Sequence, residues 1–67
     1  MSVAKVSEIS STSKKSFEDA VEQGITRAGK TIRNIRSAWI KEQHVRITDG
    51  KASEYQVNMM VTFVIDE

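Results

Sequence analysis

The chain contains no cysteine and a single histidine, which excludes two common ways of stabilising a small protein. Without cysteine there are no disulfides and no thiolate metal sites, and one histidine cannot form a histidine-based zinc site within a chain. The chain has 67 residues, and a domain of about 60 residues buries only roughly 60% of its unfolded surface. Oligomerisation is the remaining means of stabilisation. We therefore expect residues 1–67 to form a single domain that associates with copies of itself.

An excess of charge of one sign is also missing, because ten basic residues face nine acidic ones and the formal net charge is +1. This balance argues against a nucleic-acid partner, whose phosphates require a basic surface. No stretch approaches the roughly 18 apolar residues of a membrane span. The N-terminal sequence also lacks the apolar core of a secretory signal. We expect a soluble cytoplasmic protein without nucleic-acid or membrane partners.

Alternating large side chains near the end of the chain predict a β-strand, around which the rest of the chain is organised. The residues of one parity are Tyr55, Val57, Met59, Val61, Phe63 and Ile65. Period-two alternation of this kind is typical of a strand with one buried face. The other parity mixes polar and apolar residues where a solvated face would carry more charge: Gln56, Asn58, Met60, Thr62 and Val64. We expect the chain's own helix to cover one face and a subunit contact the other.

A helix is predicted to begin after Ser16, which suits the N-cap position, while Asp19 occupies the acidic position of a capping box. Proline is absent from the whole chain, so no proline interrupts the helix. Its apolar stripe comprises Phe17, Ala20, Val21, Gly24, Ile25, Ala28 and Ile32. Gly24 on this stripe would let the helix approach a sheet closely. Gly29 either marks a contact between subunits or is merely tolerated in the helix.

Two further strands complete the predicted fold. Residues 3–9 are rich in β-branched side chains and predict an edge strand, followed by a polar loop at 10–13. Residues 36–48 predict the second strand, and Asp49-Gly50 predicts a type I′ hairpin turn into the last strand. The sequence thus predicts an α+β fold of order β-α-β-β, with a three-stranded antiparallel sheet packed on one amphipathic helix.

Six segments carry a resemblance to a known family: VAKV at 3–6, TS at 12–13, SFEDA at 16–20, RAGKTIRNI at 27–35, EYQV at 54–57 and VTF at 61–63. Taken in their order, spacing and total length, they resemble the dodecin family along nearly the whole chain. The resemblance implies a β-α-β-β fold assembled into a hollow shell of twelve identical subunits. It also implies binding of a flavin, FMN or riboflavin, for storage or sequestration rather than catalysis.

The resemblance also implies a ligand site. In flavin-binding dodecins a tryptophan of the second strand stacks on the isoalloxazine ring, and a glutamine of the last strand bonds its polar edge. Gln56 matches the glutamine, whereas an ungapped count places Ser37 at the tryptophan position and Trp39 two residues further on. Trp39 would then point to the same side as Ser37, about 6.6 Å along the strand. A bulge near the strand start could restore its placement; otherwise the stacking platform is lost, as in dodecin-like proteins without this tryptophan, one branch of which is associated with calcium.

Each candidate also has a purely structural interpretation. Trp39 suits an interface or a core, and Gln56 suits a hydrogen bond to a neighbouring chain. His44 lies near the flavin cavity in the resemblance, but a surface histidine is the simpler interpretation. No cysteine, serine or aspartate constellation accompanies His44, so we expect no enzyme activity.

Charged residues offer two weaker hypotheses. Carboxylates that could supply calcium ligands, though without EF-hand spacing, are Glu18, Asp19, Glu22, Asp49, Asp66 and Glu67. Basic residues that could meet a phosphate of FMN or coenzyme A are Arg27, Lys30, Arg33 and Arg36. Solvated charge is the alternative for both sets. The leading hypothesis is a flavin-storing homododecamer; the alternative is a dodecin-like shell that binds calcium or another small ligand instead of flavin.

Overall fold

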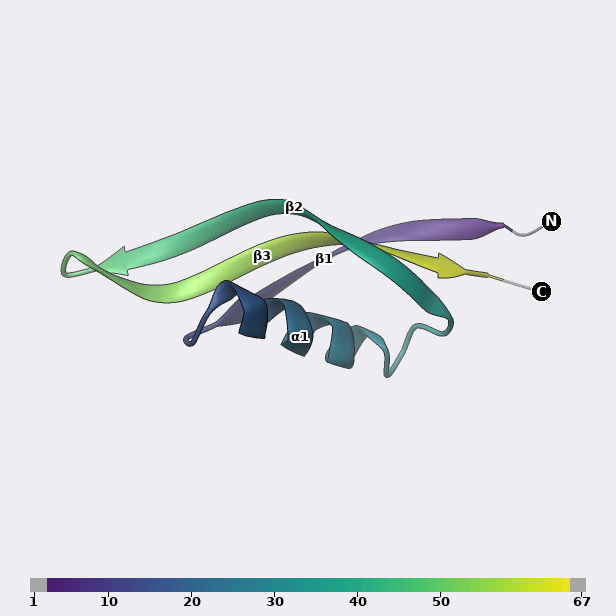
Figure 1. Cartoon of the computed structure of the whole chain (residues 1–67), viewed down its shortest axis with the longest axis horizontal. Coiled ribbons are helices and arrows are strands. Elements are labelled where there is room, and N and C mark those ends of the chain that lie inside the picture. Colours follow the sequence, from purple (N-terminus) through teal and green to yellow (C-terminus); the bar gives the residue numbers. More distant parts are fainter. Residues whose placement is uncertain (1–2, 66–67) are drawn as a thin grey trace.

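One helix packs across a three-stranded antiparallel sheet in the computed structural model, which describes residues 3–65 (Figure 1). The elements in chain order are β1 (Ala4–Ser13), α1 (Phe17–Ala28), β2 (Ile35–Thr48) and β3 (Lys51–Val64). The strand order is β1-β3-β2, so the last strand lies in the centre and pairs antiparallel with both others. The predicted α+β fold of order β-α-β-β is confirmed.

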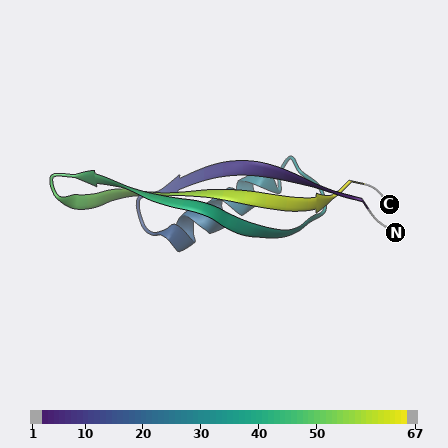
Figure 2. The same ribbon diagram turned by 90° about the horizontal axis from the view of Figure 1, so that it is seen from above.

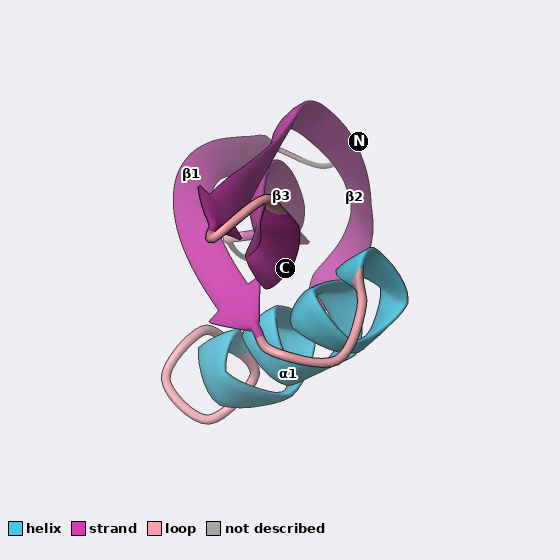
Figure 3. Ribbon diagram, turned by 90° about the vertical axis from the view of Figure 1, so that its left-hand side faces the viewer, coloured by secondary structure: helices cyan, strands magenta, loops and turns pink. Residues whose placement is uncertain are grey.

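The helix covers only one face of the sheet. Viewed along the long axis, α1 lies on one side of the twisted strands (Figure 3). The molecule measures 51 × 19 × 13 Å, and the β2–β3 hairpin extends beyond the start of α1 (Figures 1 and 2). The hairpin turns at Asp49 and Gly50, whose φ angles of 54° and 77° match the predicted type I′ turn. Among the described residues no helix is long and apolar enough to span a bilayer.

The helix begins as predicted and ends earlier. The amide of Asp19 donates to Ser16 Oγ at 3.0 Å, which confirms the N-cap. The Asp19 carboxylate accepts from Ser13 Oγ at 2.6 Å, so it ties the helix start to β1. The stripe predicted to reach Ile32 stops at Ala28, because the chain must turn back into β2, and Asn34 makes that turn with φ 62°. Gly29 is therefore the C-cap and not part of the helix interior.

The core lies between α1 and the centre of β3. Its buried residues are Ala20, Val57 and Met59, with Ile9, Phe17 and Val21 packed against them. Gly24 is buried where the helix crosses the sheet, and a Cβ there would lie 2.7 Å from Met59 Cε and 2.9 Å from Ser11 Cβ. The close approach predicted for Gly24 is confirmed.

The first strand is longer than predicted. We expected a polar loop at residues 10–13, and this was wrong, because these residues continue β1 and pair with β3 from Ser10↔Asn58 to Ser13↔Tyr55. The backbone ladder to the central strand outweighs the loop preference of serine and threonine. Two of the side chains also find partners, since Ser10 bonds Gln56 and Ser13 bonds Asp19.

Candidate functional site

Within residues 3–65 no helix covers the sheet face opposite α1, and this open face carries all four residues predicted for the flavin site. Directly paired residues of neighbouring strands point to the same side. On β2, Ser37 pairs with Thr62, Trp39 with Met60, and His44 with Gln56. Thr62, Met60 and Gln56 share one parity of β3, opposite to the buried Val57, Met59 and Val61. Ser37, Trp39, His44 and Gln56 therefore all project from the open face.

These four residues form two separate groups along the face. His44 and Gln56 are cross-strand neighbours, and both line a shallow pocket of about 430 Å³ with Val45, Arg46 and Glu54. Trp39 pairs with Met60, four residues from Gln56, which is roughly 14 Å along a strand at ~3.4 Å per residue. Trp39 is 52% exposed. The structure thus brings His44 to Gln56 but keeps Trp39 and Ser37 apart from them within one chain.

Two of the three irregularities in the pairing of β2 with β3 decide which side chains of β2 from Ser37 to His44 reach the open face. The first lies between Ile35 and Ser37, at the strand start where we considered a bulge. The second lies between Ile40 and Glu42, where Lys41 is the additional residue. Glu42 follows Trp39 by three positions and would face the helix side in a regular strand. The second bulge therefore adds Glu42 and His44 to the face that already carries Trp39.

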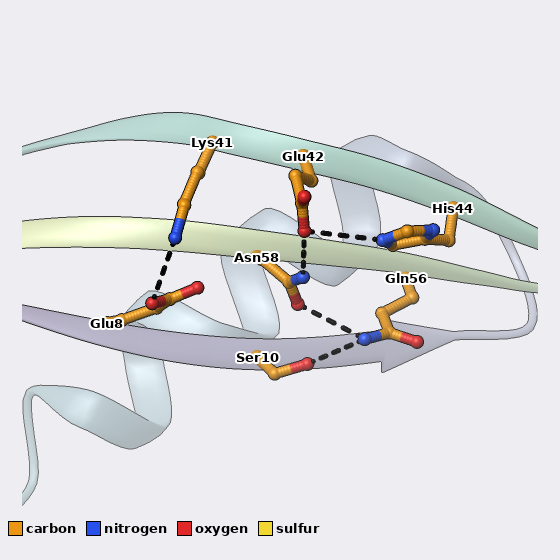
Figure 4. A network of polar contacts seen from close by, with 7 residues as sticks. All are labelled: Glu8, Ser10, Lys41, Glu42, His44, Gln56 and Asn58. Atoms are coloured by element: carbon orange, nitrogen blue, oxygen red, sulfur yellow. Dashed lines mark hydrogen bonds and ion pairs between the residues drawn. The ribbon is translucent and has the colours of Figure 1, made fainter.

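A chain of side-chain hydrogen bonds crosses all three strands on this face (Figure 4). Asn58 Nδ2 donates to Glu42 Oε1 at 2.9 Å, and Gln56 Nε2 donates to Asn58 Oδ1 at 3.1 Å. Gln56 Nε2 also donates to Ser10 Oγ at 3.0 Å. Our sequence analysis did not identify Ser10, Glu42 or Asn58 as site residues. The alternation of Gln56 and Asn58 places those two together, but nothing local reveals the bulge that adds Glu42.

Glu42 carries the negative charge of this network. The hydrogen bond from Asn58 holds the pKa of Glu42 below its ordinary value, and His44, whose Nε2 lies 3.5 Å away, acts in the same direction. A smaller contribution comes from the charge of Lys41, whose own ion pair is with Glu8 at 3.4 Å. Glu42 is therefore an ionised hydrogen-bond acceptor at neutral pH.

The other charged candidates do not converge on one place. Within residues 3–65 no three His, Cys, Asp or Glu residues lie where they could hold a metal ion together, while Asp66 and Glu67 fall outside that range. Arg27 and Lys30 line an open groove of about 660 Å³ between α1 and β1. Arg33 lines a different hollow beside Phe63.

Comparison with known proteins identifies the family. The family model described as Dodecin matches residues 3–66. The dodecin of Thermus thermophilus is 36% identical over 97% of this chain and 94% of its own length. A crystal structure of a single-substitution variant of that protein superimposes with a TM-score of 0.94 at 33% identity, covering 100% of both chains. The calcium dodecin of Mycobacterium tuberculosis is 33% identical over 94% of this chain and 89% of its own length. The chain belongs to the dodecin family.

Proposed function

We propose that this dodecin forms a homododecamer that binds FMN or riboflavin on the open sheet face and stores it without catalysis. The observation that carries the proposal is the character of that face. It is left uncovered by the chain's own helix, and it presents a half-exposed tryptophan together with a glutamine amide held by neighbouring side chains. Sequestration requires only affinity and burial of the ring, so it needs no catalytic group.

The exposed apolar surface supports self-association. Only Ile35 and Ala38 of the 14 residues of β2 are even partly buried. Large apolar side chains exposed on this edge strand are Trp39, Ile40, Val45 and Ile47. The fully buried apolar residues are few: Ala20, Val57, Met59 and Val61. A core of this size gives a small domain only marginal stability, and contacts with other copies would bury the remainder. The number twelve comes from the dodecin family resemblance.

The spacing of the two groups on the open face favours a flavin held between subunits. Trp39 offers a flat surface for stacking, worth on the order of 1 kcal/mol beyond its buried area. Gln56 offers a polar contact to the ring edge, with His44 beside it. Because Trp39 and Gln56 lie roughly 14 Å apart along one strand, we place Trp39 of one subunit and Gln56 of another on the same ring.

The second candidate is a dodecin shell that holds calcium or another small ligand in place of flavin. It is favoured by the similarity to the calcium dodecin and by Ser37, which stands where the ungapped resemblance puts the stacking tryptophan. Because no group of three potential ligands forms within residues 3–65, a calcium site would draw on carboxylates of several subunits or on Asp66 and Glu67, which lie outside that range. A phosphate-bearing ligand such as coenzyme A would meet Arg27 and Lys30 in the groove beside α1.

Riboflavin and FMN titrations of the ligand-free protein separate the two candidates. The size of the assembly is checked first by light scattering, and flavin fluorescence is then followed during the titration. Saturable quenching at a fixed ratio of flavin to subunit supports storage. An intact dodecamer that leaves flavin fluorescence unchanged, yet binds calcium in a calorimetric titration, refutes flavin storage and favours the second candidate.

A further inference from the structure

An ionised carboxylate sets the direction of the hydrogen-bond chain on the open face (Figure 4). Glu42 has no hydrogen to donate, so it can only accept, and it accepts from Asn58 Nδ2 at 2.9 Å. The lowered pKa of Glu42, caused first by Asn58 and then by His44, keeps it ionised at neutral pH. The amide of Asn58 therefore has a fixed orientation, with Oδ1 directed towards Gln56.

The same reasoning fixes the amide of Gln56. Its Nε2 carries two hydrogens, and the structure uses both, one for Asn58 Oδ1 at 3.1 Å and one for Ser10 Oγ at 3.0 Å. Within residues 3–65 no hydrogen bond reaches Gln56 Oε1, which points away from the network in Figure 4. Turning the amide over would break the bond to Asn58 Oδ1 and bring Oε1 against that oxygen, whereas Ser10 Oγ could bond either end of the amide because a hydroxyl both donates and accepts. Gln56 therefore presents only a hydrogen-bond acceptor to a ligand.

We infer that Glu42 and Asn58 are positioning residues that make Gln56 an acceptor, with Ser10 holding the same amide in place, so the bound ligand edge carries an N–H donor. This inference rests on the proposed flavin function and deepens it. The polar edge of the isoalloxazine ring carries one such group, the N3–H, which lies between two carbonyl groups. Gln56 Oε1 accepts from that N–H, so Gln56 recognises the ring edge through its N–H donor and not through its carbonyl oxygens.

The test uses lumiflavin, which has the ring without the ribityl chain, and 3-methyllumiflavin, which lacks the N3–H. Both are titrated into the ligand-free wild-type assembly. We expect lumiflavin to bind about 10-fold more tightly, because methylation removes the donor and leaves Oε1 unpaired. Equal affinities for the two ligands overturn the inference while leaving flavin storage standing. Failure of lumiflavin and riboflavin alike to bind refutes the proposed function, and the inference with it.

Substitutions then separate positioning from a general structural role. Asn58→Leu should weaken lumiflavin binding by about 5-fold and leave 3-methyllumiflavin binding nearly unchanged, because only lumiflavin uses the oriented acceptor. Glu42→Gln should reduce the preference for lumiflavin over 3-methyllumiflavin by about 2-fold to 3-fold, because a neutral amide at this position fixes the direction of the hydrogen-bond chain less strictly. Glu8→Gln is the matched control, because Glu8 is an exposed carboxylate on the same face that pairs with Lys41 and not with the network.

The outcomes are distinguishable. A loss of affinity for both ligands in Asn58→Leu, with the assembly intact by light scattering, means that Asn58 is structural and overturns its positioning role. An unchanged preference in Glu42→Gln overturns the assignment of Glu42 as the anchor. A preference that falls as far in Glu8→Gln as in Glu42→Gln attributes the effect to the charge of the face rather than to the hydrogen-bond chain.

Discussion

Replacing Gly24 by alanine tests whether the helix really touches the sheet as closely as the structure indicates. The added Cβ would lie 2.7 Å from Met59 Cε and 2.9 Å from Ser11 Cβ. Met59 Cε is the end of a flexible side chain and can move, but Ser11 Cβ is attached directly to the backbone of β1. Overpacking of this kind costs about 1–3 kcal/mol, whereas alanine favours a helix interior by about 1 kcal/mol over glycine. We therefore expect a net loss of about 1 kcal/mol in the free energy of unfolding.

The assay is denaturant unfolding of wild type and variant at one fixed subunit concentration, since association contributes to the measured stability. Gly29→Ala is the matched control, because a Cβ there would meet only backbone oxygens, the nearest being Ile25 O at 3.3 Å, and the backbone is right-handed. That variant should change stability far less. If Gly24→Ala stabilised the protein as much as helix propensity alone predicts, the close contact with Ser11 would be refuted.

Three further predictions concern the helix start, the stacking residue and the stability of the fold at acidic pH. Ser16→Ala removes the acceptor for the amide of Asp19 and should cost about 1 kcal/mol of unfolding free energy; no change in the denaturation midpoint would contradict the capping role. Trp39→Ala should weaken riboflavin binding by about 10-fold with the assembly intact; unchanged affinity in a fluorescence titration would remove Trp39 from the site. Asn58 and His44 lower the pKa of Glu42, so its ionised form stabilises the fold above its ordinary pKa, and this stabilisation disappears as the pH falls through the lowered value. The stability difference between wild type and Glu42→Gln should therefore shrink as the pH falls below the ordinary carboxyl pKa of 4.5 and through the lowered pKa of Glu42; a difference independent of pH would refute this linkage.

The sequence predicts the main architecture because the strongest signals are periodic or local. The alternation from Tyr55 to Ile65 identifies most of β3, which begins earlier, at Lys51, and ends at Val64. Ser16 predicts the helix start, and Asp49-Gly50 predicts the hairpin through its need for positive φ. Each of these features depends on a few neighbouring residues and needs no knowledge of the rest of the fold.

The parts that sequence reasoning missed depend on neighbouring strands. The serine-rich segment at 10–13 looks like a loop in isolation and becomes a strand because β3 provides its ladder partners. The bulge at Lys41 left a trace in the sequence, since Ile40 and Val45 share the helix-side face although they are five residues apart. That odd spacing could have indicated an extra residue. The hydrogen bonds that orient Gln56 join three strands, so no local pattern predicts them.

Trp39 is the only tryptophan in the chain, so its fluorescence reports directly on the open face. The most direct test of the account is to follow Trp39 emission while riboflavin is added to the ligand-free assembly. The account predicts saturable quenching of Trp39 that reaches its end point at the same flavin-to-subunit ratio as the quenching of flavin fluorescence. Flavin that binds without affecting Trp39, or Trp39 emission that never saturates, would contradict a flavin site on this face.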